Sequence, residues 1–173
     1  MGVLLDKIGY TIVMVFLILG KKGFHMKTSM EMKELYAKDY FTWTQEMVRA
    51  LSEHRIEDID FENLAEEVSD LGKAEKRALK SQFERLVAHL LKWAYTDKKG
   101  HETSWSASIS ESRERILELL EENPGLKPLS QDLFATAYRQ GVLWAMKDTN
   151  QDVFPEKCPW TIAQAMDSTF FPD

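Results

Sequence analysis

The spacing of apolar residues from position 31 onward is helical, and it constrains the fold more than any other feature of the sequence. In the first such segment, large apolar side chains recur at three- and four-residue steps: Leu35, Tyr36, Tyr40, Trp43, Met47, Val48 and Leu51. This spacing draws one apolar stripe along an α-helix, whereas a half-buried strand would alternate with a period of two. No segment has the strand period, and eight glycines and five prolines are too few for a β-sandwich, a β-barrel or a disordered chain. The sequence therefore predicts an all-α fold.

The first two predicted helices are separated by a short acidic connection. The first is expected over residues 31–53, and Asp58 or Asp60 is placed to cap the second with a carboxylate. Gly72 is expected to kink or divide the second helix, because glycine costs about 1 kcal/mol relative to alanine in a helix interior. The apolar stripe of the second helix is expected to face the core: Phe61, Leu64, Val68 and Leu71, then Leu79, Phe83, Leu86, Leu90 and Ala94.

Two longer helices and a short one complete the predicted bundle. The third begins near Ser104, turns Trp105, Ile109, Ile116 and Leu120 inward, and ends at Asn123–Pro124–Gly125. Ser130 is placed to cap the fourth, whose inward face carries Leu133, Phe134, Ala137, Gly141 and Ala145. Residues 154–160 are too rich in proline for a helix, and Thr161 with Gln164 forms a capping box for a last short helix. The expected architecture is a four- to five-helix bundle with an irregular, proline-containing C-terminal strap.

Residues 1–26 do not match the rest of the chain. Their apolar run, residues 8–19, is shorter than the roughly 20 residues that a membrane-spanning helix needs. Three interpretations stay open: a mis-called start with translation beginning at Met26, Met30 or Met32, a membrane anchor, or a packed helix. Residues 27–173 are expected to form a single domain, because this length can bury a core without disulfides or metals.

Charge and cysteine usage favour a cytoplasmic protein. The net charge of −6 weighs against broad binding to polyanions. The lone cysteine, Cys158, excludes an internal disulfide framework and fits a reducing compartment.

A row of polar side chains, here called the polar seam, follows the predicted apolar stripe. At 100° per residue, Glu75 falls on the angle of the stripe, and Gln82 and His89 follow at seven-residue steps. Arg113 lies eight residues after Trp105 and points within about 50° of the inward face of its helix. Neighbours along the row are about 10 Å apart, so the row alone cannot hold one metal ion. Two interpretations stay open: satisfied core positions, with an ion pair between Glu75 and Arg113, or one wall of a ligand pocket.

A basic patch follows an acidic stretch in the second helix. Residues 57–70 contain no basic side chain, and the next ten residues contain Lys73, Lys76, Arg77 and Lys80. Most of this patch falls opposite the apolar stripe and is expected to be exposed. It suits an acidic protein partner or a solvated helix face. Nucleic acid is not an expected partner, because no exposed aromatic side chains or groove-reading motif accompany the patch.

No recognised motif for catalysis or metal binding is present. The four histidines are scattered, without the Glu-x-x-His or His-x-x-x-His spacing of helical metal sites, and no glycine-rich phosphate loop occurs. Lys157 is placed to lower the thiol pKa of its neighbour Cys158. Pro159 follows, however, and no base can be assigned, so a structural turn is preferred over a nucleophile or a haem ligand. No catalytic residue, metal site or cofactor is predicted.

Several spaced motifs nevertheless resemble a known family. They are Asp39–Tyr40–x–x–Trp43, Ile59–Asp60–x–x–Asn63–Leu64–x–Glu66–Glu67, Leu71–Gly72–x–x–Glu75–Lys76–Arg77, His89–Leu90–Leu91–Lys92–Trp93–x–Tyr95, Ser104–Trp105 and Phe154–Pro155–x–x–Cys158–Pro159–Trp160–Thr161. Together they resemble domain-of-unknown-function family 29, which is found mainly in cyanobacteria. The resemblance covers about residues 32–172 and leaves out residues 1–26, which favours the mis-called start. It implies a helical fold and a bacterial cytoplasmic location, and it implies no activity.

The sequence favours a non-enzymatic interaction module, with a protein partner or self-association. One alternative is an enzyme, or a metal- or small-ligand-binding protein, that uses the polar seam. The other is a nucleic-acid-associated regulator that uses the basic patch. A membrane is an expected partner only if residues 1–26 are genuine.

Overall fold

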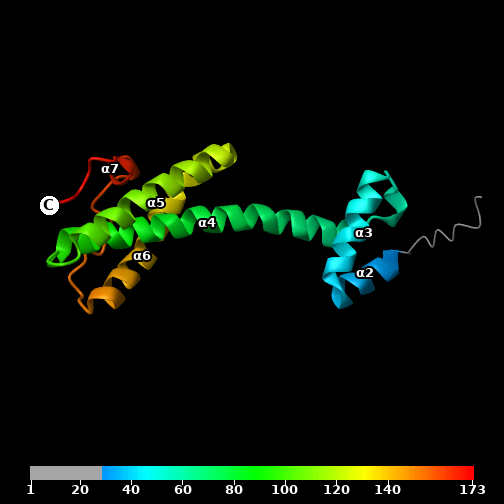
Figure 1. The fold of residues 1–173 in the computed structure, drawn as a ribbon, viewed down its shortest axis with the longest axis horizontal. Helices are drawn as coiled ribbons and strands as arrows, with labels where there is room; N and C mark the ends of the chain where they lie inside the picture. The colour runs from blue at the N-terminus through cyan, green and yellow to red at the C-terminus, as the bar shows by residue number, and fades with distance from the viewer. Residues whose placement is uncertain (1–28) are drawn as a thin grey trace, which may run out of the picture. The chain divides into compact units, whose positions relative to one another are not determined.

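The computed structural model describes residues 29–173, which form α-helices joined by short connections (Figure 1). The predicted all-α class is confirmed, and no β-strand occurs in this range. The chain divides into two compact units at the boundary between Val68 and Ser69. The single domain expected over residues 27–173 stays a prediction, and the apolar leader, residues 1–26, lies outside the described residues.

The first unit contains α2 (Ser29–Lys38), α3 (Tyr40–Ser52), the 3-10 helix η1 (Ile56–Asp58) and the beginning of α4 (Phe61–Tyr95). Its buried apolar cluster consists of Met32, Trp43, Met47, Ala50 and Ile59. The prediction of one helix over residues 31–53 is wrong, because the chain breaks at Asp39. The Asp39 carboxylate accepts a hydrogen bond from the backbone N–H of Thr42 at 3.0 Å and so begins a new helix.

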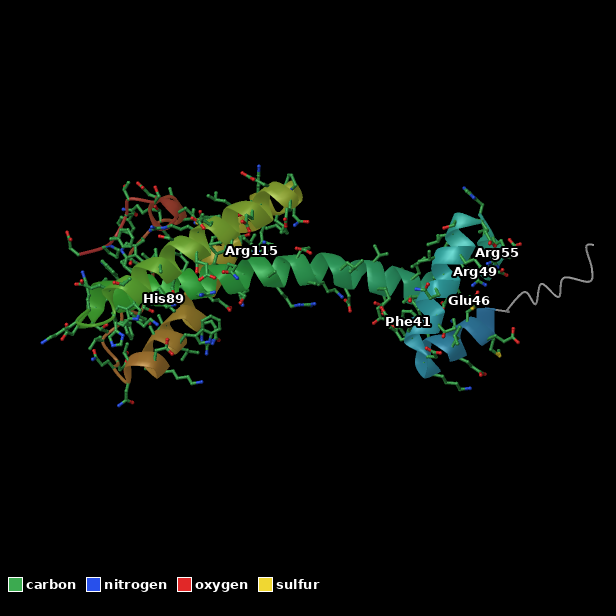
Figure 2. All side chains as sticks on the ribbon, in the orientation of Figure 1. Phe41, Glu46, Arg49, Arg55, His89 and Arg115 are labelled. Carbon is green, nitrogen blue, oxygen red and sulfur yellow. The ribbon has the colours of Figure 1, made fainter. Side chains whose placement is uncertain are left out.

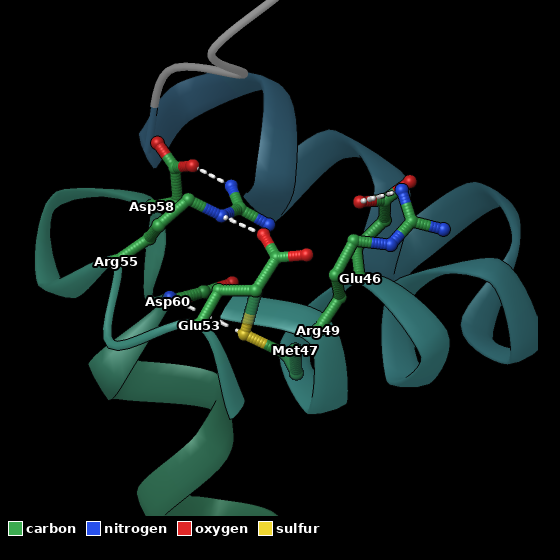
Figure 3. Close-up of polar contacts among 7 residues, drawn as sticks. All are labelled: Glu46, Met47, Arg49, Glu53, Arg55, Asp58 and Asp60. Atoms are coloured by element: carbon green, nitrogen blue, oxygen red, sulfur yellow. Dashed lines mark hydrogen bonds and ion pairs between the residues drawn. The ribbon is translucent and has the colours of Figure 1, made fainter. Parts of the chain in front are cut away.

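Buried acidic groups hold the connection between α3 and α4. The Asp60 carboxylate accepts hydrogen bonds from Trp43 Nε1 at 3.3 Å and from Asn63 Nδ2 at 2.6 Å. It also accepts the backbone N–H of Asn63 at 3.4 Å, which confirms the predicted cap of α4. Figure 3 shows the Arg55 guanidinium between the carboxylates of Glu53 and Asp58, with both of which it forms ion pairs.

Helix α4 is continuous through Gly72, so the predicted division at this residue is wrong, and the kink stays a prediction. The free-energy cost of a single exposed glycine is small compared with the stabilisation that the other backbone hydrogen bonds give a long helix. The expected inward stripe of the first half of α4 is also wrong in part. Leu64 packs against the core of the first unit, but Phe61, Val68 and Leu71 are 59%, 60% and 69% exposed.

In the second unit, the remainder of α4 is the central helix. α5 (Glu102–Glu122) and α6 (Ser130–Thr149) lie on either side of it, and α7 (Ile162–Met166) packs against the same core (Figure 1). Between Phe83 and Lys92 most side chains of α4 are buried, because its flanks face a neighbouring helix on more than one side. The shared cluster includes Leu79, Phe83, Leu86, Leu90, Ile109, Ile116, Phe134, Ala137 and Ala145.

The ends of the helices in the second unit mostly follow the sequence signals. α5 ends at the predicted Asn123–Pro124 break, and a 3-10 helix, η2 (Pro124–Leu129), leads into α6. Ser130 is not the cap of α6. It is the first helical residue, and its hydroxyl donates to the carbonyl of Leu126 at 3.2 Å.

The C-terminal strap is fastened to the bundle. The predicted capping box between Thr161 and Gln164 is confirmed at the start of α7. The hydroxyl of Tyr138 on α6 donates to the carbonyl of Pro155 at 2.6 Å, and Phe154 and Trp160 pack against the core.

Candidate functional site

A cavity of about 360 Å³ lies at one end of the second unit. Its lining comes from the last turns of α4 and α6, from the connection between α4 and α5, and from the start of α5: Lys92, Thr96, Asp97, His101, Trp105, Asp148, Thr149 and Gln151. Cavities of a few hundred Å³ with a small number of polar groups are typical of small-ligand sites.

A buried lysine forms one side of this cavity. The Lys92 side chain is 5% exposed, and its Nζ atom donates to Asp148 Oδ2 on α6 at 2.7 Å. Lysine is almost never buried without a partner, because desolvating an ammonium group is costly. Within residues 29–173, Asp148 is the one hydrogen-bond acceptor of this ammonium group, which carries three protons.

Two stacked rings form another side. The His101 ring lies parallel to the Trp105 ring, with centroids 5.0 Å apart and an interplanar angle of 9°. Lys92 Nζ lies 5.6 Å from the Trp105 centroid, within range of a cation–π contact. Gly100 positions His101 just before α5, since its φ of +81° is a conformation that favours glycine. The cavity therefore combines an ammonium group with an aromatic surface.

His89, one turn before Lys92 on α4, has an unusual environment (Figure 2). Burial, followed by the positive charges of Lys92 and Arg85, lowers the pKa of His89 to about 4. Its Nδ1 atom is buried and has no hydrogen-bond partner within the described residues. His89 is therefore neutral at physiological pH.

The structure does not join the polar seam into one site. Glu75 is exposed and accepts a hydrogen bond from Asn123 Nδ2 at 3.4 Å, whereas Gln82 and His89 are half-buried. The expected ion pair between Glu75 and Arg113 is wrong. The Arg113 guanidinium instead donates to the C-terminal backbone, to the carbonyl oxygens of Ala165 at 2.8 Å, Ser168 at 3.4 Å and Phe170 at 2.6 Å. No hydrogen bond or ion pair joins any two seam residues in the described range, and a functional role for the seam stays a prediction.

The basic patch is largely exposed, as expected. Lys76 and Arg77 are exposed, Lys73 forms an ion pair with Asp70 at 2.8 Å, and Lys80 pairs with Glu84 at 3.1 Å. Neither ion pair has two buried partners, so each contributes little to stability. A binding role for the patch stays a prediction.

Cys158 lies in a protected position. Burial raises the pKa of its thiol, and the thiol donates to the carbonyl of Trp160 at 3.3 Å. The lowering of its pKa that Lys157 suggested is therefore wrong, because desolvation, which raises the pKa, is the largest cause of the shift. A structural role suits this thiol better than a nucleophilic one.

Residues 29–173 contain neither a metal-binding cluster nor a membrane-spanning helix. This range contains no cluster of three or more His, Cys, Asp or Glu side chains arranged to hold a metal ion. None of the helices in this range is long and apolar enough to cross a membrane.

Sequence reasoning missed the cavity, although Lys92 and Trp105 both lie in the motifs that carry the family resemblance. Lys92 lies off the single apolar stripe assigned to α4, so the periodicity gave no reason to expect its burial. Asp148 is separated from it by 56 positions, and only the packing of α6 against α4 brings the pair together.

The comparisons with known proteins agree with the sequence motifs. No curated protein and no solved structure matches the chain. A family model, described as Domain of unknown function DUF29, matches residues 35–171, which is most of the sequence. The chain therefore belongs to the DUF29 family, as its motifs predicted.

Proposed function

We propose that this protein is a non-enzymatic interaction module whose partner is a second copy of the chain. The observation that carries the proposal is the exposure of large apolar side chains on the first half of α4. Phe61, Val68 and Leu71 are 59%, 60% and 69% exposed, although their spacing is typical of a buried stripe. Exposed apolar side chains that recur at helical spacing are a common feature of protein interfaces.

The exposed acidic side chains of this part of α4 lie on the face of the helix opposite the apolar ones. Glu62, Glu66 and Asp70 follow one another at four-residue steps and are exposed. The basic residues Lys73, Lys76, Arg77 and Lys80 come next in the sequence, and most of them also fall opposite the apolar stripe. A two-fold symmetric pair therefore buries the apolar side chains of each copy against the same surface of the other and leaves these charges in solvent.

A reducing compartment such as the bacterial cytoplasm suits this module. The lone cysteine, Cys158, forms no internal disulfide, and the net charge is −6.

Substitution of the exposed apolar side chains tests the proposal. We expect the full chain to sediment as a dimer in analytical ultracentrifugation. The double variant Val68→Glu/Leu71→Glu places charges in the interface and is expected to sediment as a monomer. The double variant Glu66→Lys/Asp70→Lys changes charges on the opposite face of the helix and is expected to remain a dimer. All four positions are exposed, so the fold is expected to survive in both variants.

The matched control is Lys127→Glu, an exposed charge reversal on η2, which is expected to leave the dimer intact. A monomeric wild-type chain over the whole concentration range would overturn the proposal. So would a dimer that Val68→Glu/Leu71→Glu does not weaken, because the interface would then lie elsewhere.

A further inference from the structure

We propose that the cavity beside Lys92 binds a small zwitterion, a molecule that carries both a carboxylate and an ammonium group, as free α-amino acids do. This inference concerns the second unit alone and does not depend on self-association. It rests on the burial of Lys92, on the charges that line the cavity and on its aromatic wall.

The Lys92 ammonium group is the first anchor. It is 5% exposed, and its one acceptor in the described range, Asp148 Oδ2 at 2.7 Å, leaves proton donors that face the cavity. A ligand carboxylate at this point takes up those donors in charge-assisted hydrogen bonds.

The aspartates of the lining are the second anchor. Asp97 and Asp148 both line the cavity, against the single lysine, so the carboxylates outnumber the ammonium group two to one. A simple anion such as phosphate would be repelled by this excess of negative charge, and a simple cation would leave the remaining proton donors of Lys92 without an acceptor. A zwitterion satisfies both conditions, because its ammonium group pairs with the aspartates while its carboxylate pairs with Lys92.

The stacked rings of His101 and Trp105 supply the third contact. Both rings line the cavity, with centroids 5.0 Å apart, and give this wall an aromatic surface. An apolar ligand side chain packs against such a wall without leaving polar groups unpaired. A volume of about 360 Å³ is enough for a molecule of the size of leucine.

The experiment compares L-leucine with its two halves. Isocaproate keeps the carboxylate and the side chain, and isoamylamine keeps the ammonium group and the side chain. Each is titrated into the ¹⁵N-labelled full chain, and the chemical shift of the Trp105 indole N–H is followed, with its assignment made from Trp105→Phe. We expect leucine to bind with a Kd about tenfold lower than either half, since each charge-assisted contact is worth that much or more.

Variants separate the two anchors. Lys92→Met removes the ammonium group but nearly keeps the side-chain volume, and it is expected to raise the Kd of leucine and of isocaproate by about tenfold. Asp97→Asn, at an exposed position, is expected to raise the Kd of leucine and not to raise the Kd of isocaproate. Lys147→Met and Asp132→Asn, exposed changes on α6 outside the cavity lining, are the matched controls and are expected to bind like the wild type.

Three results would overturn the proposal. Equal affinity for leucine and isocaproate would make the cavity a site for anions. Equal affinity for leucine and isoamylamine would make it a site for cations. The absence of a saturable shift with all three probes would show that the cavity holds only water. If the spectrum of Lys92→Met loses its dispersion, this variant has not folded. Asp97→Asn then still tests whether the protein recognises the ammonium group of the ligand.

Discussion

The side chain of Val87 on α4 lies directly against the backbone of Gly141 on α6. A Cβ atom placed on Gly141 would lie 2.6 Å from Val87 Cγ1 and 2.9 Å from Val87 Cβ. It would also lie 3.1 Å from the carbonyl oxygen of Glu84. Gly141 lies on the inward face of α6, as the sequence predicted, and its lack of a side chain sets how closely the two helices approach.

Replacement of this glycine is expected to destabilise the second unit. In Gly141→Ala the new methyl group meets a β-branched side chain and a backbone carbonyl, neither of which yields easily. Overpacking of this kind costs typically 1–3 kcal/mol, which exceeds the gain of about 1 kcal/mol in helix propensity. The free energy of unfolding, measured by urea denaturation, is expected to fall by about 1–2 kcal/mol.

Gly72→Ala is the matched control, because nothing lies within 4 Å of the added methyl group. This variant is expected to gain about 0.5–1 kcal/mol from propensity alone. The double variant Gly141→Ala/Val87→Ala removes only the contact with Cγ1. The contacts with the Cβ atom of residue 87 and with the Glu84 carbonyl remain, so this variant should recover little of the loss. A Gly141→Ala protein as stable as Gly72→Ala would show that the helices separate without cost.

Arg113 is expected to hold the C-terminal segment. Arg113→Lys retains the charge, but its single nitrogen cannot reach the three carbonyl oxygens that three different guanidinium nitrogens contact. Buried or partly buried acceptors are then left without partners. We expect a loss of about 2–4 kcal/mol in the free energy of unfolding. Hydrogen exchange should accelerate over residues 161–173.

Arg115→Lys and Glu75→Ala are the controls for this prediction. Arg115 pairs with Glu118 at the surface, and Glu75 is exposed, so both changes are expected to stay within about 0.5 kcal/mol of the wild type. If Glu75→Ala destabilised the chain as much as Arg113→Lys, the ion pair suggested by the sequence would have to be reconsidered.

The stability of the second unit is expected to depend on pH through His89. The pKa of His89 is lowered from 6.5 to about 4 in the folded chain, chiefly by burial. Between these pH values the unfolded state binds more protons at this residue, so the free energy of unfolding rises with pH and reaches its full value above about 6.5. Residue 89 cannot titrate in His89→Gln, so the free energy of unfolding of this variant should vary less over this pH window. The expected difference from the wild type is about 1–2 kcal/mol, because solvent screens the partly exposed ring. The free energy of unfolding is measured by urea denaturation at several pH values from 4 to 7. If it changed equally with pH in the two proteins, the result would contradict the burial of the imidazole.

Cys158 is expected to react slowly with alkylating reagents. Burial raises the pKa of its thiol, so little thiolate is present at pH 8 and the reagent has poor access. Iodoacetamide labelling, followed by mass spectrometry, should be slower by about tenfold or more in the folded chain than in urea. Fast labelling of the folded chain would instead indicate an exposed, reactive thiol.

Local signals in the sequence determined much of this structure. Each of these signals depends on neighbouring residues alone, so it can be recognised without knowing the rest of the fold. They are the helical period, the Asn123–Pro124 break, the Asp60 cap and the Thr161 capping box. Asp39 is a local signal that the apolar period alone does not show, since an aspartate within such a period can cap a new helix.

Only the tertiary structure decided the environment of the polar groups. Periodicity shows which side chains share a face of a helix, but it does not show what lies opposite that face. Lys92 is buried because α4 is surrounded in the second unit, and Arg113 binds carbonyls because the C-terminal segment returns across α5. Conversely, Val68 and Leu71 follow a buried pattern and remain exposed, because no described element covers them. Partners distant in sequence are set by packing, and for that physical reason the seam, the cavity and the exposed stripe required the three-dimensional structure.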